Sequence, residues 1–97
     1  MAGKVIDEVA AELASARATH APMNSHHEGY AVILEELDEL WEVCKVNTHK
    51  VPHGFNDSGF QAEQRRITKR ANMRKEALQV AAMAVRFIED VCDKESQ

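Results

Sequence analysis

EALQVAAMAVRFI, residues 76–88, is the stretch of sequence that decides the fold of this chain. Apolar residues point almost all round a helix in this segment, which is typical of a helix buried on every side. Two other short helices cannot surround it, so we expect a second subunit to cover the remaining side. The sequence therefore predicts an all-α fold: a helical bundle of two long antiparallel helices plus an N-terminal helix, completed by oligomerisation.

Helix boundaries follow from capping and breaking residues on either side of this stretch. Ser58-Gly59-Phe60-Gln61 is a capping box that predicts the start of the last helix, which we expect to reach Asp93. Residues 47–57 contain Pro52 and Gly54 and have no helical period, so they predict a loop. A second capping box, Ser25 to Glu28, predicts a middle helix over residues 26–46, and apolar spacing predicts a first helix over residues 3–18.

The middle helix has an apolar stripe that we interpret as its core face. The stripe runs at helical spacing through Tyr30, Ile33, Leu37, Leu40 and Cys44, with Leu34 and Trp41 widening it. We expect these side chains to be packing residues.

The amino-acid composition indicates which class of protein this chain belongs to. Ninety-seven residues make one domain, residues 1–97, and 44% hydrophobic with 29% charged residues is ordinary for a globular protein. The longest apolar run is far below the roughly 18 residues of a membrane span, and Asp7, Glu8 and Glu12 are unlike a signal peptide. We expect a cytoplasmic protein without a membrane partner, in which Cys44 and Cys92 are free thiols.

Charge is distributed unevenly beneath a net charge of −4. Residues 28–42 hold six acidic residues and no basic one, whereas residues 65–75 hold six basic residues and no acidic one. The first segment suits cations and the second suits anions. The acidic total and the lack of interleaved aromatic residues make a nucleic-acid partner unlikely.

Acidic side chains form a stripe on the middle helix that also contains valines, and like charges at neighbouring helical positions repel one another. On the last helix a polar stripe crosses apolar surroundings and needs partners; it contains Glu76, Gln79, Arg86 and Asp90. If the two helices pack antiparallel, Glu36 and Glu39 can face Glu76 and Gln79. Such a cluster of oxygen ligands suits a hard cation such as Mg²⁺.

These segments resemble a known family. Glu35-Glu36-Leu37-Asp38-Glu39 is an EExxE motif, and with residues 27–31 and 75–87 it resembles the MazG-like family of all-α nucleoside triphosphate pyrophosphohydrolases over about residues 26–92. The resemblance implies that Glu36, Glu39 and Glu76 are Mg²⁺ ligands and that Glu35 helps to hold a second ion or orients the attacking water. The family has ExxD where this chain has Glu76 and Gln79, so Gln79 occupies the place of an aspartate ligand and brings no charge.

The resemblance also implies a reaction, the conversion of a nucleoside triphosphate to the monophosphate and pyrophosphate. Arg65 and Lys69, in the basic run, would then bind the substrate phosphates, although this run is equally well interpreted as a solvated helix start. A homodimer or a dimer of dimers is the expected assembly. The alternative to an enzyme is a non-catalytic helical oligomerisation module on the same scaffold, and Gln79 is the residue that favours it.

Overall fold

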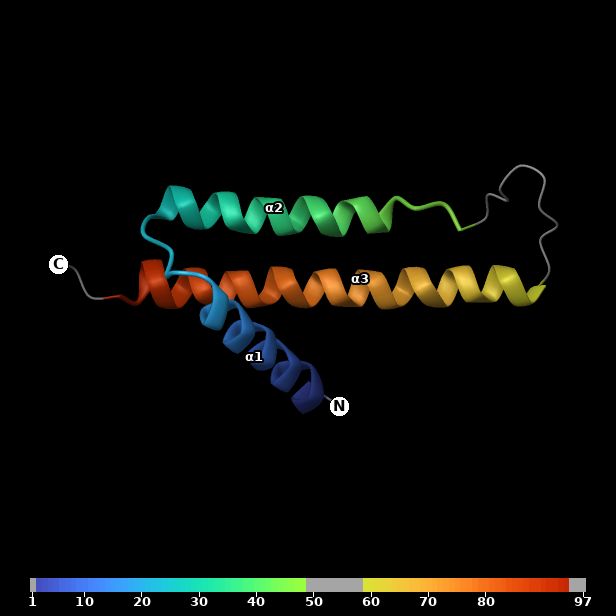
Figure 1. Ribbon diagram of the computed structural model, residues 1–97, viewed down its shortest axis with the longest axis horizontal. Helices are drawn as coiled ribbons and strands as arrows, with labels where there is room; N and C mark the ends of the chain where they lie inside the picture. Colours follow the sequence, from blue (N-terminus) through green and yellow to red (C-terminus); the bar gives the residue numbers. More distant parts are fainter. Residues whose placement is uncertain (1, 49–58, 95–97) are drawn as a thin grey trace.

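Two long helices, α2 (His26–Cys44) and α3 (Gly59–Phe87), run antiparallel side by side in the computed structural model of the chain, and α1 (Ala2–Thr19) crosses α3 obliquely (Figure 1). A short π-helix, η1 (Ile88–Cys92), continues directly from α3. The structure describes residues 2–48 and 59–94, and all regular structure in those ranges is helical. The prediction of an all-α fold is therefore confirmed.

The predicted helix boundaries agree with the described part of the chain to within two residues, apart from the end of α3. The Ser25 side chain accepts a hydrogen bond from the Glu28 N–H at 3.1 Å, as the capping box predicts. Glu28 reaches back one residue further than expected and accepts from the Asn24 N–H. The capping box at Ser58 and residues 49–57 of the predicted loop lie outside the described residues.

The end of α3 differs from the prediction. A single helix to Asp93 was expected, but the helix widens after Phe87, and the Asp93 N–H donates to the Ile88 carbonyl five residues earlier at 2.7 Å. This pattern defines a π-turn, for which the sequence carries no simple signal.

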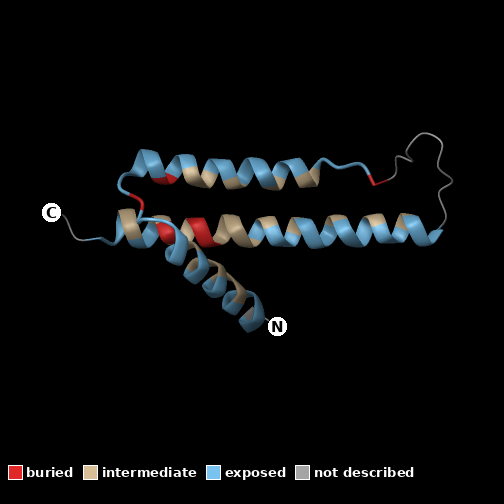
Figure 2. Ribbon diagram, viewed as in Figure 1, coloured by how far each residue is buried: buried red, intermediate tan, exposed pale blue. Residues whose placement is uncertain are grey.

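The core is small and lies at one end of the molecule, where the connection between α1 and α2 crosses α3 (Figure 2). Its buried apolar residues are Met23, Ala82 and Met83, and Met23 is 1% exposed. Val9 and Leu13 of α1 and Val32 and Ile33 of α2 are among the partly buried residues that pack against them.

Gly29 permits the close approach of α2 to α3 at this core. A Cβ atom at this position would lie 2.8 Å from Cε2 of Phe87 and 3.2 Å from the Met23 sulfur, which is closer than packed carbon atoms tolerate. Glycine is therefore required here for packing.

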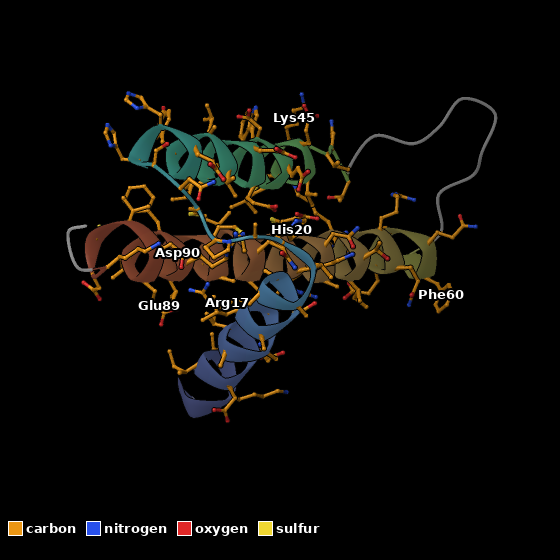
Figure 3. All side chains as sticks on the ribbon, turned by 60° about the vertical axis from the view of Figure 1, so that its left-hand side comes forward. Arg17, His20, Lys45, Phe60, Glu89 and Asp90 are labelled. Atoms are coloured by element: carbon orange, nitrogen blue, oxygen red, sulfur yellow. The ribbon has the colours of Figure 1, made fainter. Side chains whose placement is uncertain are left out.

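Polar contacts fasten α1 and its connection to the end of α3. Arg17 donates to Glu89 at 2.7 Å and pairs with Asp90 at 3.0 Å, and all three are labelled in Figure 3. Asp90 also accepts from the Met23 N–H at 3.0 Å. Arg86, which is only 4% exposed, donates to the Ala21 carbonyl at 3.0 Å. Arg86 and Asp90 of the polar stripe on α3 thus find partners within the chain, which the sequence did not indicate.

The predicted core stripe of α2 is wrong in part for the single chain. Tyr30, Leu37 and Trp41 are 64%, 49% and 61% exposed, because α3 packs on a face of α2 rotated away from them. Ile33 and Leu40, at the edge of the predicted stripe, are partly buried. No helix in the described residues combines the length and apolar character needed to cross a membrane.

Candidate metal centre

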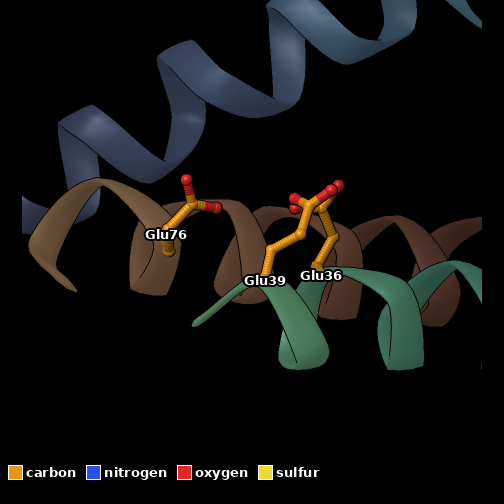
Figure 4. Close-up of side chains that lie close together, drawn as sticks. All are labelled: Glu36, Glu39 and Glu76. Atoms are coloured by element: carbon orange, nitrogen blue, oxygen red, sulfur yellow. The ribbon is translucent and has the colours of Figure 1, made fainter. Parts of the chain in front are cut away.

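Three carboxylates converge between α2 and α3. Glu36 and Glu39 are three residues apart on α2 and so share one face, and the antiparallel α3 brings Glu76 opposite them (Figure 4). One oxygen from each of the three lies within 4.8 Å of the others. The structure thus brings together three of the four ligands predicted from sequence, and we call these three residues the carboxylate cluster.

The electrostatics of the carboxylate cluster are unfavourable for the protein alone. The pKa of Glu36 is raised from 4.5 to about 7, mainly by burial and further by the neighbouring charges of Glu39, Glu76 and Glu35. Among the described residues, no lysine or arginine forms an ion pair with any of the three. Positive charge is therefore what the cluster lacks.

A cleft of about 570 Å³ lies between α1 and the α2–α3 pair, and Glu36 of the carboxylate cluster lines it. Glu35 and Glu36 of α2, Gln79 and Arg86 of α3 and Glu12 of α1 are among its lining residues, and we call it the α1 cleft. Glu35, the predicted catalytic residue, thus lies in the same cleft as the predicted metal ligand Glu36. A cavity of this volume is in the range of small-molecule sites.

Gln79 has a partner that the sequence did not predict. Its side-chain amide nitrogen donates to the Glu12 carboxylate at 2.5 Å, so α1 supplies a carboxylate next to the position where the family pattern has an aspartate. Glu12 lies beside the apolar stripe of α1 formed by Val9, Leu13 and Ala16, which pack on the core. A half-buried acid next to such a stripe is the signal that could have identified it.

Arg65 and Lys69 lie away from the carboxylate cluster. Lys69 donates to the Val46 carbonyl at 2.8 Å, and Arg65 donates to the Thr48 carbonyl at 3.2 Å. Lys69 is seven residues before Glu76 and Arg65 is eleven, which correspond to roughly 10 and 16 Å along the helix axis. In this structure they hold the chain at the end of α2, where helix carbonyls attract cations.

These two residues also line a second cleft, of about 430 Å³, with Thr48 and Asn72. The structure therefore does not bring the predicted phosphate-binding residues together with the predicted metal ligands.

No family model matches the chain, and neither a curated protein nor a solved structure matches it.

Proposed function

We propose that this protein is a Mg²⁺-dependent nucleoside triphosphate pyrophosphohydrolase of the MazG-like kind, acting on the cytoplasmic nucleotide pool. The observation that supports the proposal is the convergence of Glu36, Glu39 and Glu76 between α2 and α3, with Glu36 also lining the α1 cleft. The EExxE motif on α2 supplies the first two of these residues, and the next long helix supplies the third.

The residues present fit Mg²⁺. All the donors are carboxylate oxygens, which hard cations prefer, and three carboxylates leave coordination positions for water and phosphate. Burial and the repulsion of neighbouring carboxylates raise the pKa of Glu36 to about 7, and a bound cation would relieve the repulsion. Glu36, Glu39 and Glu76 would hold the ion, and Gln79 would add its carbonyl oxygen, because only its amide nitrogen is engaged by Glu12.

The proposed reaction is attack of water on the α-phosphorus of a nucleoside triphosphate. A new oxygen–phosphorus bond forms, and the bond from the α-phosphorus to the oxygen that bridges to the β-phosphorus breaks, which gives the monophosphate and pyrophosphate. Bound Mg²⁺ neutralises the phosphate oxygens. Glu35 lines the cleft beside Glu36 and would accept the proton from the attacking water.

Hydrolysis at the cluster does not require Arg65 or Lys69 to leave the end of α2. Both side chains donate to backbone carbonyls there, Arg65 through Nε and Lys69 through Nζ. The Lys69 ammonium has three N–H donors, so this hydrogen bond does not by itself prevent contact with phosphate.

The direct test is incubation with a mixture of nucleoside and deoxynucleoside triphosphates and Mg²⁺, with quantification of pyrophosphate and of each monophosphate. Glu36→Gln and Glu39→Gln should each lower the rate by about 100-fold or more, because each removes a charged ligand of the Mg²⁺ that would neutralise the phosphate oxygens. Asp38→Asn is the matched control: it removes an exposed carboxylate of the same helix and should leave the rate unchanged. Equal pyrophosphate release by wild type and both cluster variants would contradict the proposal.

The second candidate is a non-catalytic helical oligomerisation module. The observation that favours it is position 79, where an amide bonded to Glu12 stands in place of a metal-binding aspartate. Mg²⁺ binding with no release of pyrophosphate from any nucleotide would support this alternative. For either function we propose a homo-oligomer, a homodimer or a dimer of dimers, that completes the helical bundle.

A further inference from the structure

One side of α2 exposes a row of large apolar side chains. Tyr30, Leu34, Leu37 and Trp41 are 64%, 40%, 49% and 61% exposed and follow one another at intervals of four, three and four residues. Alternating intervals of three and four residues are the spacing of the a and d positions at which one helix packs along another in a coiled coil. The row is therefore a seam shaped for another helix.

The seam lies on the side of the molecule that α1 leaves uncovered. Glu28 and Glu35 line the α1 cleft, and at 100° per residue Tyr30 and Leu37 lie about 160° around α2 from them. The same geometry places Ala77, Ala81 and Ile88 of α3 on the side of that helix opposite Gln79 and Arg86, which contact α1 and its connection.

Because α2 and α3 are antiparallel neighbours, these two apolar rows lie on the same side of the helix pair. We call this surface the hairpin face; it consists of Tyr30, Leu34, Leu37 and Trp41 with Ala77, Ala81 and Ile88. Ile88 is 49% exposed and Ala77 is also exposed, so nothing within the described chain covers the α3 part.

The size of the face approaches what a stable pair of chains needs. Tyr30 and Trp41 each expose on the order of 100 Å² or more, since an aromatic side chain offers 150–250 Å² in all. With the leucines and the α3 residues the patch reaches several hundred Å², which is more than monomers normally expose and approaches the roughly 800 Å² per partner of a standard interface. The small core, with Met23, Ala82 and Met83 as its buried apolar residues, leaves the single chain short of apolar burial.

We infer that the hairpin face binds a second copy of this chain, with α2 antiparallel to α2 of the partner subunit about a two-fold axis. The seam is complementary to itself in this arrangement, because Tyr30 and Trp41 lie equally far from its centre and so do Leu34 and Leu37. Tyr30 therefore meets Trp41 of the partner subunit, while Leu34 meets Leu37 of the partner subunit. The antiparallel direction also opposes the two helix dipoles. Glu28, Glu35 and Glu36 of α2 line the α1 cleft, on the other side of the helix from the seam, so these like charges do not meet across it.

This inference specifies the homo-oligomer proposed above and is independent of the hydrolase reaction. Trp41 is the only tryptophan and lies in the seam, so its fluorescence reports directly on the interface. In sedimentation experiments at micromolar concentration the mass should be twice 10.9 kDa or a multiple of that dimer mass. On dilution below the dissociation constant, the Trp41 emission should shift to longer wavelength together with the loss of mass.

Leu37→Glu tests the face itself, because it buries an unpaired charge only in the assembled state. It should raise the dissociation constant by about 100-fold or more and move the Trp41 emission to the exposed position at all concentrations. Ile6→Glu is the matched control, since Ile6 is 66% exposed on α1 and lies outside the hairpin face. Assembly that survives Leu37→Glu and is lost in Ile6→Glu, or a wild-type chain that remains a 10.9 kDa monomer, would overturn the inference.

Disulfide trapping tests the register and does not depend on Leu37→Glu folding. In a Cys44→Ala, Cys92→Ala background, Tyr30→Cys chains mixed with Trp41→Cys chains should form mixed disulfide dimers under mild oxidation. Neither variant alone should cross-link, because its two cysteines would be 11 residues, roughly 16 Å, apart along the seam. Cross-linking of either variant to itself, or of neither to the other, would overturn the antiparallel pairing.

Discussion

Glu36 and Asp90 are two partly buried carboxylates whose surroundings have opposite effects. Burial tends to raise the pKa of Asp90, but the Met23 N–H and the Arg17 guanidinium donate to this carboxylate and hold its pKa below its ordinary value. Burial also raises the pKa of Glu36, and there the neighbours are Glu39, Glu76 and Glu35, so the pKa rises to about 7.

The difference separates a structural carboxylate from a candidate binding carboxylate. Asp90 has a cationic partner and an N–H donor within the chain, so its negative charge is stabilised in the folded protein without a bound ligand. Glu36 finds only like charge among the described residues, and the fold places it at the mouth of a cleft. Local arrangements that cost stability are expected at functional sites, where a ligand compensates for them.

The largest expected effect is on the Asp90 side of this comparison. Asp90→Ala should lower the free energy of unfolding by about 3 kcal/mol, because it leaves the Met23 N–H without its acceptor and Arg86 without a nearby negative charge. The melting temperature should fall by more than about 10 °C. Glu89→Ala removes the more exposed partner of Arg17 and should cost less than about 1 kcal/mol. Similar losses from both variants would show that Asp90 is not the anchor described here.

For Glu36 the expected change in the free energy of unfolding has the opposite sign. Glu36→Gln removes one of three mutually repelling charges, so without divalent cations it should stabilise the protein by about 1 kcal/mol. Mg²⁺ should raise the melting temperature of the wild type, because it binds the folded state alone, and should raise that of the variant far less. Thermal melts with and without Mg²⁺ measure both effects. If Mg²⁺ does not raise the melting temperature of the wild type, the carboxylate cluster does not bind this cation.

The pH dependence of stability distinguishes the two carboxylates directly. The folded pKa of Glu36, about 7, lies above its ordinary value of 4.5, so its contribution is fully present below about pH 4.5 and is lost as the pH rises through 7. The lowered pKa of Asp90 has the opposite consequence: its contribution is present above its ordinary value of 3.8 and is lost as the pH falls through the folded pKa.

Chemical denaturation of the wild type and of Glu36→Gln between pH 4.5 and 8, in the absence of divalent cations, isolates the first of these effects. The stability of the wild type relative to the variant should decline over this range. Saturating Mg²⁺ should reduce the decline, because the bound ion favours the charged carboxylate at every pH. A relative stability that does not change with pH would mean that Glu36 titrates at its ordinary value.

The smallest expected effect concerns Gln79. Gln79→Asp adds the carboxylate of the family pattern but places it next to Glu12, so it should tighten Mg²⁺ binding by about 10-fold at most while destabilising the cation-free protein. Titration calorimetry with Mg²⁺ gives the affinity, and the double variant Glu12→Gln, Gln79→Asp should recover the lost stability. Unchanged affinity in Gln79→Asp would mean that position 79 does not contact the ion.

Much of the candidate site could be predicted from spacing alone. A separation of three residues places Glu36 and Glu39 on one helical face whatever surrounds them, and an antiparallel neighbour with a polar stripe brings Glu76 within reach. Arg65 and Lys69 show the limit of such reasoning, because charge indicates what a side chain can bind but not which of several acceptors is nearest. In the structure the nearest acceptors are the carbonyls of Thr48 and Val46.

The sequence by itself determined the all-α class, the boundaries of the first two helices and the grouping of acidic residues, because helical periodicity and capping are local properties. Only the tertiary structure decided which face of α2 meets α3, and so left Tyr30, Leu37 and Trp41 exposed. It also decided that α1 supplies Glu12 and Arg17 as partners for α3. A helix with apolar residues over a wide arc can pack in several rotations, and the close approach of Gly29 to Phe87 selects one of them.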